Sequence, residues 1–446
     1  MGRYFGTDGI RGIANVDLTP QLAYLTGFAA ATVIGAETEG KTRAIIGKDT
    51  RISSDMIEAA LIAGLCAGGA DATPIGVVPT PAVAFLTRKT DADLGIVISA
   101  SHNSYEHNGI KFFDRNGHKL TAALEDAIEA IIDMPQSVAA KTHGELGTVV
   151  ADTRGFDTYI EHLASRATDT YRGLKVAIDC ANGAAAVTAR KLFGQFMCKT
   201  EFIHDRPDGV NINAGCGSTS LDSLRKTVAR GGFDVGFAFD GDADRCLIID
   251  EMGETIDGDV LLALAAQAMK RDGKLTNDAI VCTIVSNSGL DDFGRREGIA
   301  VFRSNVGDKN VFEMMLAEGA AIGGEESGHT IFFEESTTGD GQLSAIKFLN
   351  LLARTGKSAS ELARDVPKYP KAVVNAKVAN EDKKPKLASP VLTDAIEQVE
   401  RELEGSGRIL VRASGTEALI RVTVEAASEA KAQELAERVA KIITEI

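Results

Sequence analysis

The chain has 446 residues, about three times the length of a typical 150-residue domain, so a single small binding module is excluded. Hydrophobic residues make up 44% of the chain and charged residues 25%, proportions typical of a folded protein in water rather than a disordered or fibrous one. The net charge of −15, the absence of tryptophan and an aromatic content of 5% argue against a nucleic-acid partner.

Neither a membrane span nor a signal peptide is predicted. The apolar stretch from Leu22 to Ala36 is shorter than the roughly 18 to 20 residues that a span needs. Arg3, Asp8 and Arg11 stand where a signal peptide would be apolar. The six cysteines are scattered, with no C-x-x-C pair, as expected for reduced thiols. We therefore expect a cytoplasmic protein with no membrane partner; a homodimer is a candidate assembly.

The first 150 residues alternate helices with apolar strands, the order of an α/β domain. Thr19 and Pro20 have the residue types of a helix cap and first turn, for a helix that runs to about Ile34. Strands are expected over 43–47 and 94–98, and further helices from Ser53 or Ser54 and after Thr121.

Two more α/β domains are predicted, over residues 151–254 and 255–366. Their strands are expected at 176–179, 200–203, 235–239, 280–285, 301–303 and 320–323. Helices are expected from Gly183, near Thr219, after Asp259 and from Asp308. Residues 367–446 are predicted to form a smaller α+β domain, with strands at 409–412 and 419–425, a charged loop at 380–386 and a last helix. That helix is expected to place Leu435, Val439, Ile442 and Ile446 on one face.

Three carboxylates follow the apolar strand at 235–239, in Asp240-Gly-Asp242-Ala-Asp244-Arg245. Like charges in one turn repel each other unless their oxygens hold a divalent cation. An EF-hand is the rival, because Glu251 also fits its twelfth position. However, Arg245 stands where that loop needs glycine, and strands flank the motif instead of helices. The spacing favours a Mg²⁺ loop over a calcium loop or a solvated acidic turn.

Ser99, Ser101 and His102 follow the predicted strand at 94–98, at the edge where open α/β sheets carry their sites. Serine hydrolysis is disfavoured because neighbouring side chains on an extended chain point apart and no G-x-S-x-G elbow is present. A hydroxyl that carries a phosphoryl group fits better, with the metal and with Lys111 and Arg11 as counter-charges. On this motif alone, a structural Ser-His turn stays open.

Two further loops contain polar groups between glycines. In Gly323-Gly-Glu325-Glu-Ser327-Gly-His329, a carboxylate and a hydroxyl suit the vicinal hydroxyls of a sugar, with an acidic turn as the alternative. Arg412, Ser414, Gly415 and Thr416 combine a guanidinium, two hydroxyls and an open backbone, which suits a phosphate group.

Five motifs in this order resemble the α-D-phosphohexomutase family, most closely its bacterial members that act on aminohexose phosphates. The motifs are F-G-T-D-G-I-R-G at 5–12, I-S-A-S-H-N at 98–103, D-G-D-x-D-R at 240–245, G-E-x-S-G-H at 324–329 and R-x-S-G-T-E at 412–417. The resemblance implies three consecutive Rossmann-like α/β domains and a smaller C-terminal α+β domain around a central cleft.

The resemblance implies that Ser101 is phosphorylated in the active enzyme. It also implies that the phosphate on Ser101, together with Asp240, Asp242 and Asp244, binds one Mg²⁺ per chain. The first domain then carries the active serine, the second the metal-binding loop, the third the sugar-binding loop and the fourth the phosphate-binding loop.

Arg11, Lys111, Arg245 and His329 match family positions that line the reaction centre, with Lys111 or His329 as the proton carrier. A lysine base would need its pKa lowered from about 10.4 to roughly 7 to 8, which nearby carboxylates would oppose. Glu325 and Ser327 match the loop that binds sugar hydroxyls. The site of the non-reacting phosphate is implied at Arg412, Ser414, Gly415 and Thr416.

The activity implied is that of an isomerase that converts glucosamine 6-phosphate to glucosamine 1-phosphate through a hexosamine 1,6-bisphosphate, which also primes the enzyme. Its product would supply amino-sugar nucleotides and cell-wall precursors. Glucose or mannose phosphates are alternative substrates, and a catalytically silent sugar-phosphate binder is the alternative from another class. Ser104, Ala413 and Ala418 stand where relatives often have proline, which is expected to loosen these loops.

Overall fold

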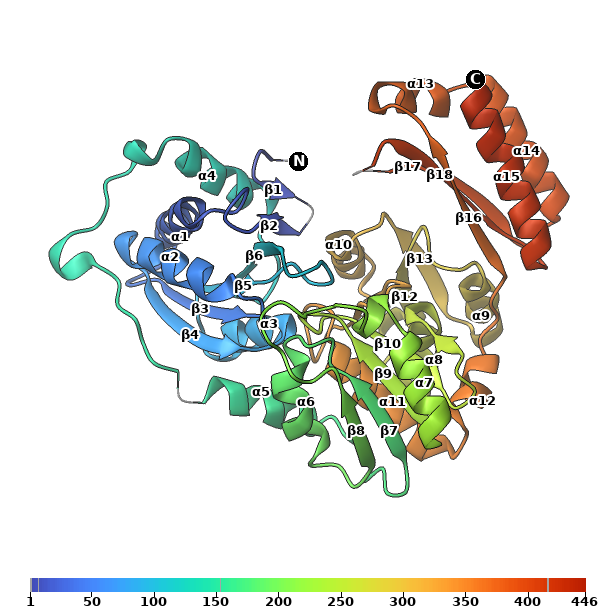
Figure 1. Ribbon diagram of the computed structural model, residues 1–446, viewed down its shortest axis with the longest axis horizontal. Coiled ribbons are helices and arrows are strands. Elements are labelled where there is room, and N and C mark those ends of the chain that lie inside the picture. Colours follow the sequence, from blue (N-terminus) through green and yellow to red (C-terminus); the bar gives the residue numbers. More distant parts are fainter. Residues whose placement is uncertain (1, 7, 153, 415–416) are drawn as a thin grey trace. The chain divides into compact units, whose positions relative to one another are not determined.

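The computed structural model describes residues 2–6, 8–152, 154–414 and 417–446 and contains four β-sheets with their helices (Figure 1). The chain divides into two compact units. The first unit comprises residues 1–283 and 302–363, and the second comprises residues 284–301 and 364–446.

The first sheet is six-stranded, in the order β1-β2-β6-β5-β3-β4. Strands β3 and β4 and strands β3 and β5 pair in parallel, whereas β6 runs antiparallel to both β5 and β2. Helices α1, α2 and α4 share one hydrophobic core with this sheet, and α3 packs against β3 and β5. Its elements are β1 (Phe5–Gly6), β2 (Gly9–Ile13), α1 (Pro20–Gly35), β3 (Arg43–Lys48), α2 (Ser54–Ala67), β4 (Asp71–Val77), α3 (Thr80–Lys89), β5 (Leu94–Ile98), β6 (His107–Asp114) and α4 (Ala122–Asp133).

The second sheet is five-stranded, in the order β11-β10-β9-β7-β8. Strands β7, β8 and β9 are parallel, and β10 returns antiparallel to β9 after the turn at residues 240–245. That reversal places the three predicted aspartates at the carboxyl end of β9. The elements are α5 (Gly155–Ala164), β7 (Lys175–Asp179), α6 (Ala185–Phe193), β8 (Lys199–Ile203), α7 (Asp222–Gly231), β9 (Val235–Phe239), β10 (Cys246–Asp250) and β11 (Thr255–Ile256).

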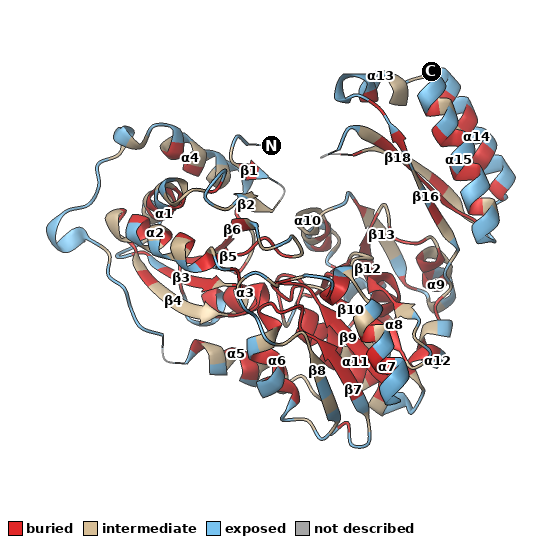
Figure 2. Cartoon of the chain, in the orientation of Figure 1, coloured by how far each residue is buried: buried red, intermediate tan, exposed pale blue. Residues whose placement is uncertain are grey.

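The third sheet has the strand order β13-β12-β14-β15, with β12 and β14 parallel and β15 antiparallel to β14. Strands β5, β9 and β12, one from each of the first three sheets, are buried along their whole length (Figure 2). The elements are α8 (Gly258–Arg271), β12 (Ala279–Thr283), β13 (Ala300–Ser304), α10 (Asp308–Glu318), β14 (Ile322–Gly324), β15 (Thr330–Phe332), α11 (Gly341–Thr355) and α12 (Ala359–Arg364).

The second unit contains an antiparallel sheet in the order β16-β18-β17. In its last helix Leu435, Val439 and Ile443 are fully buried and Ile442 is half-buried. The prediction is wrong for Ile446, which is exposed and lies beyond the last helical residue, Glu445. The predicted loop at 380–386 is also wrong in part, because Lys383–Leu387 form the short helix α13. The elements are α9 (Gly289–Glu297), β16 (Lys371–Lys377), α13, α14 (Pro390–Leu403), β17 (Arg408–Ala413), β18 (Leu419–Glu425) and α15 (Glu429–Glu445).

The expected fold class is confirmed: three α/β sheets are followed by a smaller α+β part. Helix α1 begins after Thr19, whose hydroxyl accepts a hydrogen bond from the Leu22 amide, as predicted. Helix α7, in contrast, begins at Asp222 and not near Thr219, which lies in a 3₁₀ turn. Within the described ranges, no helix is long and apolar enough to cross a membrane. The domain limits near 150, 254 and 366 stay predictions.

A buried hydrogen bond joins α5 to the start of α11. The Tyr159 hydroxyl donates to Asp340 Oδ2 at 2.9 Å, and Asp340 Oδ1 accepts from the Leu343 amide at 2.9 Å. We expect Tyr159→Phe to lower the free energy of unfolding by about 1–2 kcal/mol, because Asp340 stays buried and loses a donor. Urea denaturation measures this change. Tyr24→Phe, at an exposed tyrosine, is the control and should change it by less than about 0.5 kcal/mol; equal effects would contradict the prediction.

Candidate active site

Ser101 lies in the turn that follows β5, and its hydroxyl points to the second sheet's aspartate loop. Ser101 is buried, and its Oγ donates a hydrogen bond to Asp240 Oδ2 at 2.6 Å. The Oγ also lies 3.3 Å from His102 Nδ1. Burial, followed by the charges of Arg245 and Arg11, lowers the pKa of His102 to about 4, so this imidazole is neutral at pH 7. The serine and the aspartate loop, 139 residues apart, therefore form one site.

Asp240, Asp242 and Asp244 form a compact group of carboxylates. One oxygen from each lies within 4.8 Å of the others, and all three residues are buried. Among the described residues, no hydrogen-bond partner reaches Asp242 Oδ1 or Asp244 Oδ1. Burial and the neighbouring aspartates raise the pKa of Asp240. Buried carboxylate oxygens without donors are costly unless a cation binds them, so these residues fit a hard divalent ion such as Mg²⁺.

Lys111 lies on β6 and compensates part of this negative charge. Its Nζ is 2.8 Å from Asp242 Oδ2, 3.0 Å from Asp8 Oδ2 and 3.7 Å from Asp244 Oδ2. Burial acts to lower the pKa of Lys111, but Asp242, Asp8 and Asp244 together raise it above its ordinary value. Lys111 also holds the pKa of Asp242 below its usual range, against the effect of burial. In this arrangement Lys111 is an ammonium at neutral pH.

A network of charges that the sequence analysis did not assign to the site continues from Lys111. Asp8 binds Arg11 and lies 2.5 Å from Lys119 Nζ, which is also 2.5 Å from Asp308 Oδ2. Burial opposes ionisation of Asp8, but Lys111, Lys119 and Arg11 hold its pKa well below the ordinary value. Asp8 stands inside the first motif of the sequence, whereas nothing in the sequence indicates that Lys119 lies beside it.

Arg245 and His329 also lie close to the aspartates and their counter-charges, with His329 Nε2 3.6 Å from Asp308 Oδ2. The Arg245 amide donates to Asp240 Oδ1 at 3.2 Å, but its Nε, 3.9 Å from Asp244 Oδ1, has no hydrogen-bond partner in the described part of the chain. His329 Nε2 accepts a hydrogen bond from the Gly339 amide at 3.1 Å, and its buried Nδ1 has no partner within the same ranges. Both side chains therefore keep buried polar atoms available for a ligand.

Glu325 and Ser327 lie in the turn between β14 and β15. The Glu325 amide donates to the His329 carbonyl at 3.0 Å, which closes the turn, and Glu325 Oε1 accepts from the Gly307 amide at 3.0 Å. The Ser327 hydroxyl is buried and has no hydrogen-bond partner among the residues described. The turn thus contains a carboxylate and a buried, unpaired hydroxyl, and its role as a sugar-binding loop stays a prediction.

Four family models match the chain: phosphoglucomutase/phosphomannomutase alpha/beta/alpha domain I at residues 2–138, domain II at 157–253, domain III at 257–369 and the C-terminal domain at 373–442. The chain belongs to the phosphoglucomutase/phosphomannomutase family. These enzymes are phosphohexomutases, which are isomerases, so the family resemblance stated from the motifs is confirmed.

Curated relatives of this phosphohexomutase span its whole length. The phosphoglucosamine mutase of Acetivibrio thermocellus is 47% identical over 446 residues, 100% of this chain and 99% of that protein. The phosphoglucosamine mutase of Caldanaerobacter subterraneus is 47% identical over 445 residues, 99% of each chain.

Two solved structures share the fold. One is a phosphoglucomutase/phosphomannomutase family protein from Burkholderia thailandensis, with a TM-score of 0.81 and 23% identity over 98% of this chain and 97% of that chain. The other is the Aspergillus fumigatus N-acetylphosphoglucosamine mutase with GlcNAc-6P and magnesium, with a TM-score of 0.71 and 18% identity over 99% and 95%.

The second unit of this phosphohexomutase carries the predicted phosphate loop. Arg412 on β17 lies opposite Arg421 on β18, and Arg412 Nε is buried without a hydrogen-bond partner among the described residues. Burial and then Arg421 lower the pKa of Arg412. Two adjacent guanidinium groups favour an anion. Ser414 is buried at the end of β17, while Gly415 and Thr416 lie outside the described residues.

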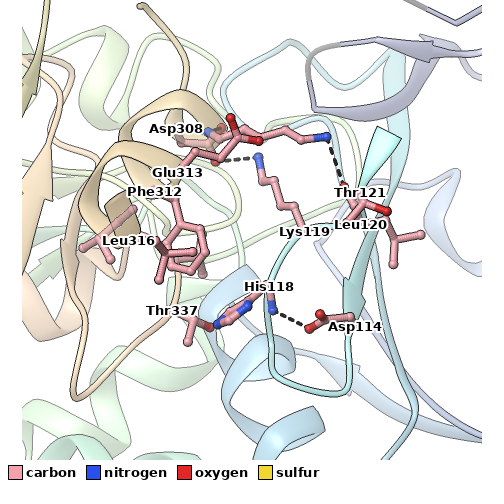
Figure 3. A pocket seen from close by; sticks show the side chains of 13 residues that line it. Asp114, His118, Lys119, Leu120, Thr121, Asp308, Phe312, Glu313, Leu316 and Thr337 are labelled. Carbon is pink, nitrogen blue, oxygen red and sulfur yellow. Dashed lines mark hydrogen bonds and ion pairs between the residues drawn. The ribbon is translucent and has the colours of Figure 1, made fainter. Parts of the chain in front are cut away.

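A cavity of about 180 Å³ borders the site in the first unit (Figure 3). Lys119 and Asp308 separate it from Asp8, and Phe312 and Leu316 of α10 line its apolar side. Neither Ser101 nor any of the three aspartates lines this cavity. The cavity therefore lies next to the group formed by Ser101 and the three aspartates and does not include it.

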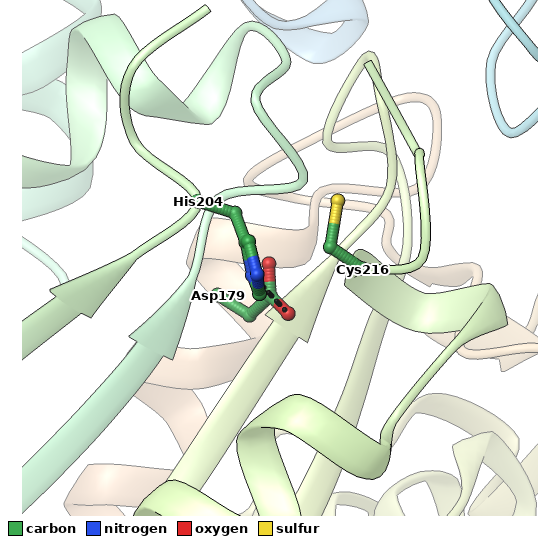
Figure 4. A group of neighbouring side chains, drawn as sticks. All are labelled: Asp179, His204 and Cys216. Carbon is green, nitrogen blue, oxygen red and sulfur yellow. Dashed lines mark ion pairs between the residues drawn. The ribbon is translucent and has the colours of Figure 1, made fainter. Parts of the chain in front are cut away.

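Asp179, His204 and Cys216 form a second group with metal-ligand side chains (Figure 4). The two Asp179 oxygens already accept hydrogen bonds from the amides of Ala181 at 2.9 Å and Gly217 at 3.0 Å. Burial, and then Asp179, raise the pKa of Cys216 to about 12, so it is a neutral thiol. Figure 4 shows the sulfur directed away from the Asp179–His204 pair. The position of Asp179 is explained by its hydrogen bonds to the amides of the two following turns.

Proposed function

We propose that this chain is a phosphoglucosamine mutase, which interconverts glucosamine 6-phosphate and glucosamine 1-phosphate in the cytoplasm. The observation that carries the proposal is the hydrogen bond from Ser101 Oγ to Asp240 in the buried aspartate group. It combines a hydroxyl that can accept a phosphoryl group with carboxylates that fit a divalent cation. The choice of glucosamine is supported by relatives of that name at 45–47% identity along the whole chain.

In the proposed reaction, Ser101 carries a phosphoryl group at the start of each cycle. The P–O bond to Ser101 Oγ breaks and a P–O bond to the free hydroxyl of the sugar phosphate forms. The proton of that hydroxyl ends on Ser101 Oγ, which becomes the hydroxyl that donates to Asp240. The hexosamine 1,6-bisphosphate then turns over within the site. Its other phosphoryl group returns to Ser101 Oγ, and the sugar oxygen released takes back a proton. Catalysis rests on in-line positioning and charge stabilisation.

Asp240, Asp242 and Asp244 are the residues that would hold Mg²⁺, together with the phosphate on Ser101. Bound there, the ion would supply positive charge next to the phosphoryl group in transfer. A phosphoserine near −2 with three aspartates and Mg²⁺ leaves a charge of about −3. Lys111 lies against these aspartates, and we assign it, with Arg11 and Arg245, the task of offsetting that charge.

The proton carrier is proposed to be Lys111 or His329. Asp242, Asp8 and Asp244 raise the pKa of Lys111, so Lys111 keeps its proton at neutral pH. The raised pKa disfavours Lys111 as the base and leaves it only the role of a proton donor. His329 Nε2 already accepts from the Gly339 amide, so a neutral His329 carries its proton on the buried, unpaired Nδ1. Either residue can donate its proton only if the sugar oxygen lies within hydrogen-bond distance of it.

The remaining predicted residues are proposed to bind the sugar phosphate. Glu325 and the unpaired hydroxyl of Ser327 suit the sugar hydroxyls. Arg412, which has a buried Nε without a partner among the described residues, suits the non-reacting phosphate. We propose the same phosphate-binding role for the rest of its loop, Ser414, Gly415 and Thr416.

We expect kcat/KM for glucosamine 6-phosphate to exceed the values for glucose 6-phosphate and mannose 6-phosphate by at least about tenfold, because a cationic amine is the main feature that separates these substrates. Initial rates with each sugar phosphate, primed by the matching 1,6-bisphosphate, measure this ratio. Equal or faster turnover of the glucose or mannose phosphate would reassign the enzyme within its family.

A further inference from the structure

The backbone of the proposed nucleophile has an unfavourable conformation. Ser101 has a φ of 53°, in the left-handed region that costs a non-glycine residue about 1 kcal/mol. Such a conformation persists only where the surroundings determine it, and it often marks a functional position. The contacts that hold Ser101 in this conformation therefore bear on the direction of its hydroxyl.

The side chain of Arg51 binds the loop that contains Ser101 through several backbone carbonyls. Arg51 is buried, with no exposed side-chain surface. Its Nη2 donates to the carbonyls of Ser101 and Asn103, both at 2.9 Å. Its Nη1 donates to the carbonyl of His107 at 3.0 Å and to that of Ser104. One rigid, planar group thus joins four carbonyls over seven residues of the loop.

Asp49 fixes both Arg51 and the amide side of Ser101. Asp49 Oδ2 accepts hydrogen bonds from Arg51 Nε at 2.7 Å and from Ser99 Oγ at 2.7 Å. Ser99 Oγ in turn accepts from the Ser101 amide at 2.9 Å. Together with the four bonds to carbonyls, the bond from Arg51 Nε to Asp49 gives all five N–H groups of the Arg51 guanidinium an acceptor. These bonds offset the cost of burying its charge. The amide and the carbonyl of Ser101 are therefore both fixed through the Asp49–Arg51 pair.

Asn213 binds the same two carbonyls from the second sheet. Its Nδ2 donates to the Ser101 carbonyl at 2.9 Å and to the Asn103 carbonyl at 3.0 Å. Asn213 lies between β8 and the following 3₁₀ turn, whereas Arg51 follows β3 of the first sheet. Each carbonyl has two lone pairs, and both are used here. The serine loop is thus held from both sheets whose residues meet in the site.

We propose that Arg51 is a positioning residue for phosphoryl transfer, which acts with Asp49 and Asn213 to hold Ser101 in its left-handed conformation. This inference rests on the proposed function, in which Ser101 carries the phosphoryl group. In that conformation Ser101 Oγ lies 2.6 Å from Asp240, at the aspartate group. A shift of about 1 Å in a reacting oxygen can reduce the rate of transfer by about 10²-fold, while the groups that bind the sugar stay in place.

Arg51→Lys tests this role, because lysine keeps the charge but cannot join the four carbonyls with one planar group. We expect kcat to fall by at least about tenfold while KM for glucosamine 6-phosphate changes by less than about threefold. The matched control is Arg43→Lys, at the opposite end of β3, where an exposed arginine donates to the Asp91 carbonyl. The control should keep the wild-type kcat.

A second measurement separates positioning from a general loss of folded protein. The enzyme is phosphorylated beforehand, and two amounts are then measured: the phosphate lost to water and the phosphate transferred to the sugar. We expect Arg51→Lys to change the ratio of these two amounts, whereas partial unfolding alone would leave the ratio constant. If Arg51→Lys does not fold, the same two measurements are made on Asn213→Gly instead. Asn213 has a φ of 58°, which glycine tolerates, and this variant removes only the second donor.

The outcomes distinguish this inference from the proposed function. A wild-type enzyme without mutase turnover would overturn the proposed function itself. An active wild type with an unchanged kcat in Arg51→Lys, or with a kcat loss that only follows the folded fraction at a constant ratio, would overturn the role of Arg51. A selective fall in kcat with a changed ratio supports it.

Discussion

Ser101→Ala is expected to reduce mutase turnover by at least about 10⁴-fold, because the variant lacks the oxygen that is proposed to carry the phosphoryl group. Ser101 Oγ is the hydroxyl that donates to Asp240 in the aspartate group, and alanine leaves the buried backbone contacts of the loop unchanged. Intact mass spectrometry should also find one phosphate on the wild type after incubation with the 1,6-bisphosphate, and none on the variant.

Ser104→Ala is the matched control, since Ser104 is exposed in the same loop and contributes its backbone carbonyl to Arg51. It should keep wild-type turnover and the phosphate. Mutase turnover in Ser101→Ala within tenfold of the wild type would contradict the phosphoserine mechanism. A phosphate that remains on Ser101→Ala would assign the modification to another residue.

The centre of the candidate site could be predicted from the sequence because its motifs directly follow buried strands. Strand β5 ends at Ile98 and β9 at Phe239, at the limits that the apolar runs predict. Side chains that follow such strands in an α/β sheet gather at its carboxyl edge. That rule, with the family resemblance, is sufficient to place Ser101 near the aspartate loop. It needs no knowledge of individual contacts.

Other parts depend on pairings that a single sequence does not contain. No strand was predicted around Lys111, whereas Lys111 lies on β6, which pairs antiparallel with β5 so that Lys111 is opposite Val97. The ion pair between Lys119 and Asp308 joins a residue that follows the first sheet's β6 to the first residue of α10, which packs on the third sheet. The two residues are far apart in the sequence. Neither pairing has a local signal such as periodicity or a cap.

The serine loop shows the same limit. Serine at position 104, in place of the proline common in relatives, was expected to loosen this loop. In the structure the Ser104 carbonyl accepts a hydrogen bond from Arg51, which lies 53 residues earlier in the chain. A proline acts on the flexibility of the unfolded chain, whereas this bond acts on the folded loop. The sequence shows the first effect only.

Removal of divalent cations is expected to reduce mutase turnover by at least about 10³-fold and to lower the melting temperature. Three buried carboxylates remain close together without a cation, and Lys111 contacts only Asp242 and Asp244 of the three. Turnover should return with Mg²⁺. A cation at a hundredfold excess over its dissociation constant stabilises the folded state by about 2.7 kcal/mol. Thermal unfolding with chelator and then with Mg²⁺ measures the shift.

Asp240→Asn distinguishes the effect of cation binding from the effect of the buried charge on the stability of the fold. A carboxyl group whose pKa is higher in the folded than in the unfolded state lowers the stability of the protein at any pH above the unfolded-state pKa. The raised pKa of Asp240 therefore destabilises the cation-free protein at neutral pH. Asparagine removes the charge and keeps the shape. The variant without cation should therefore melt at a higher temperature than the wild type without cation, show a smaller shift with Mg²⁺ and lose turnover. A cation-free variant that melts lower, with the full Mg²⁺ shift retained, would show that Asp240 is not one of the residues that hold the ion.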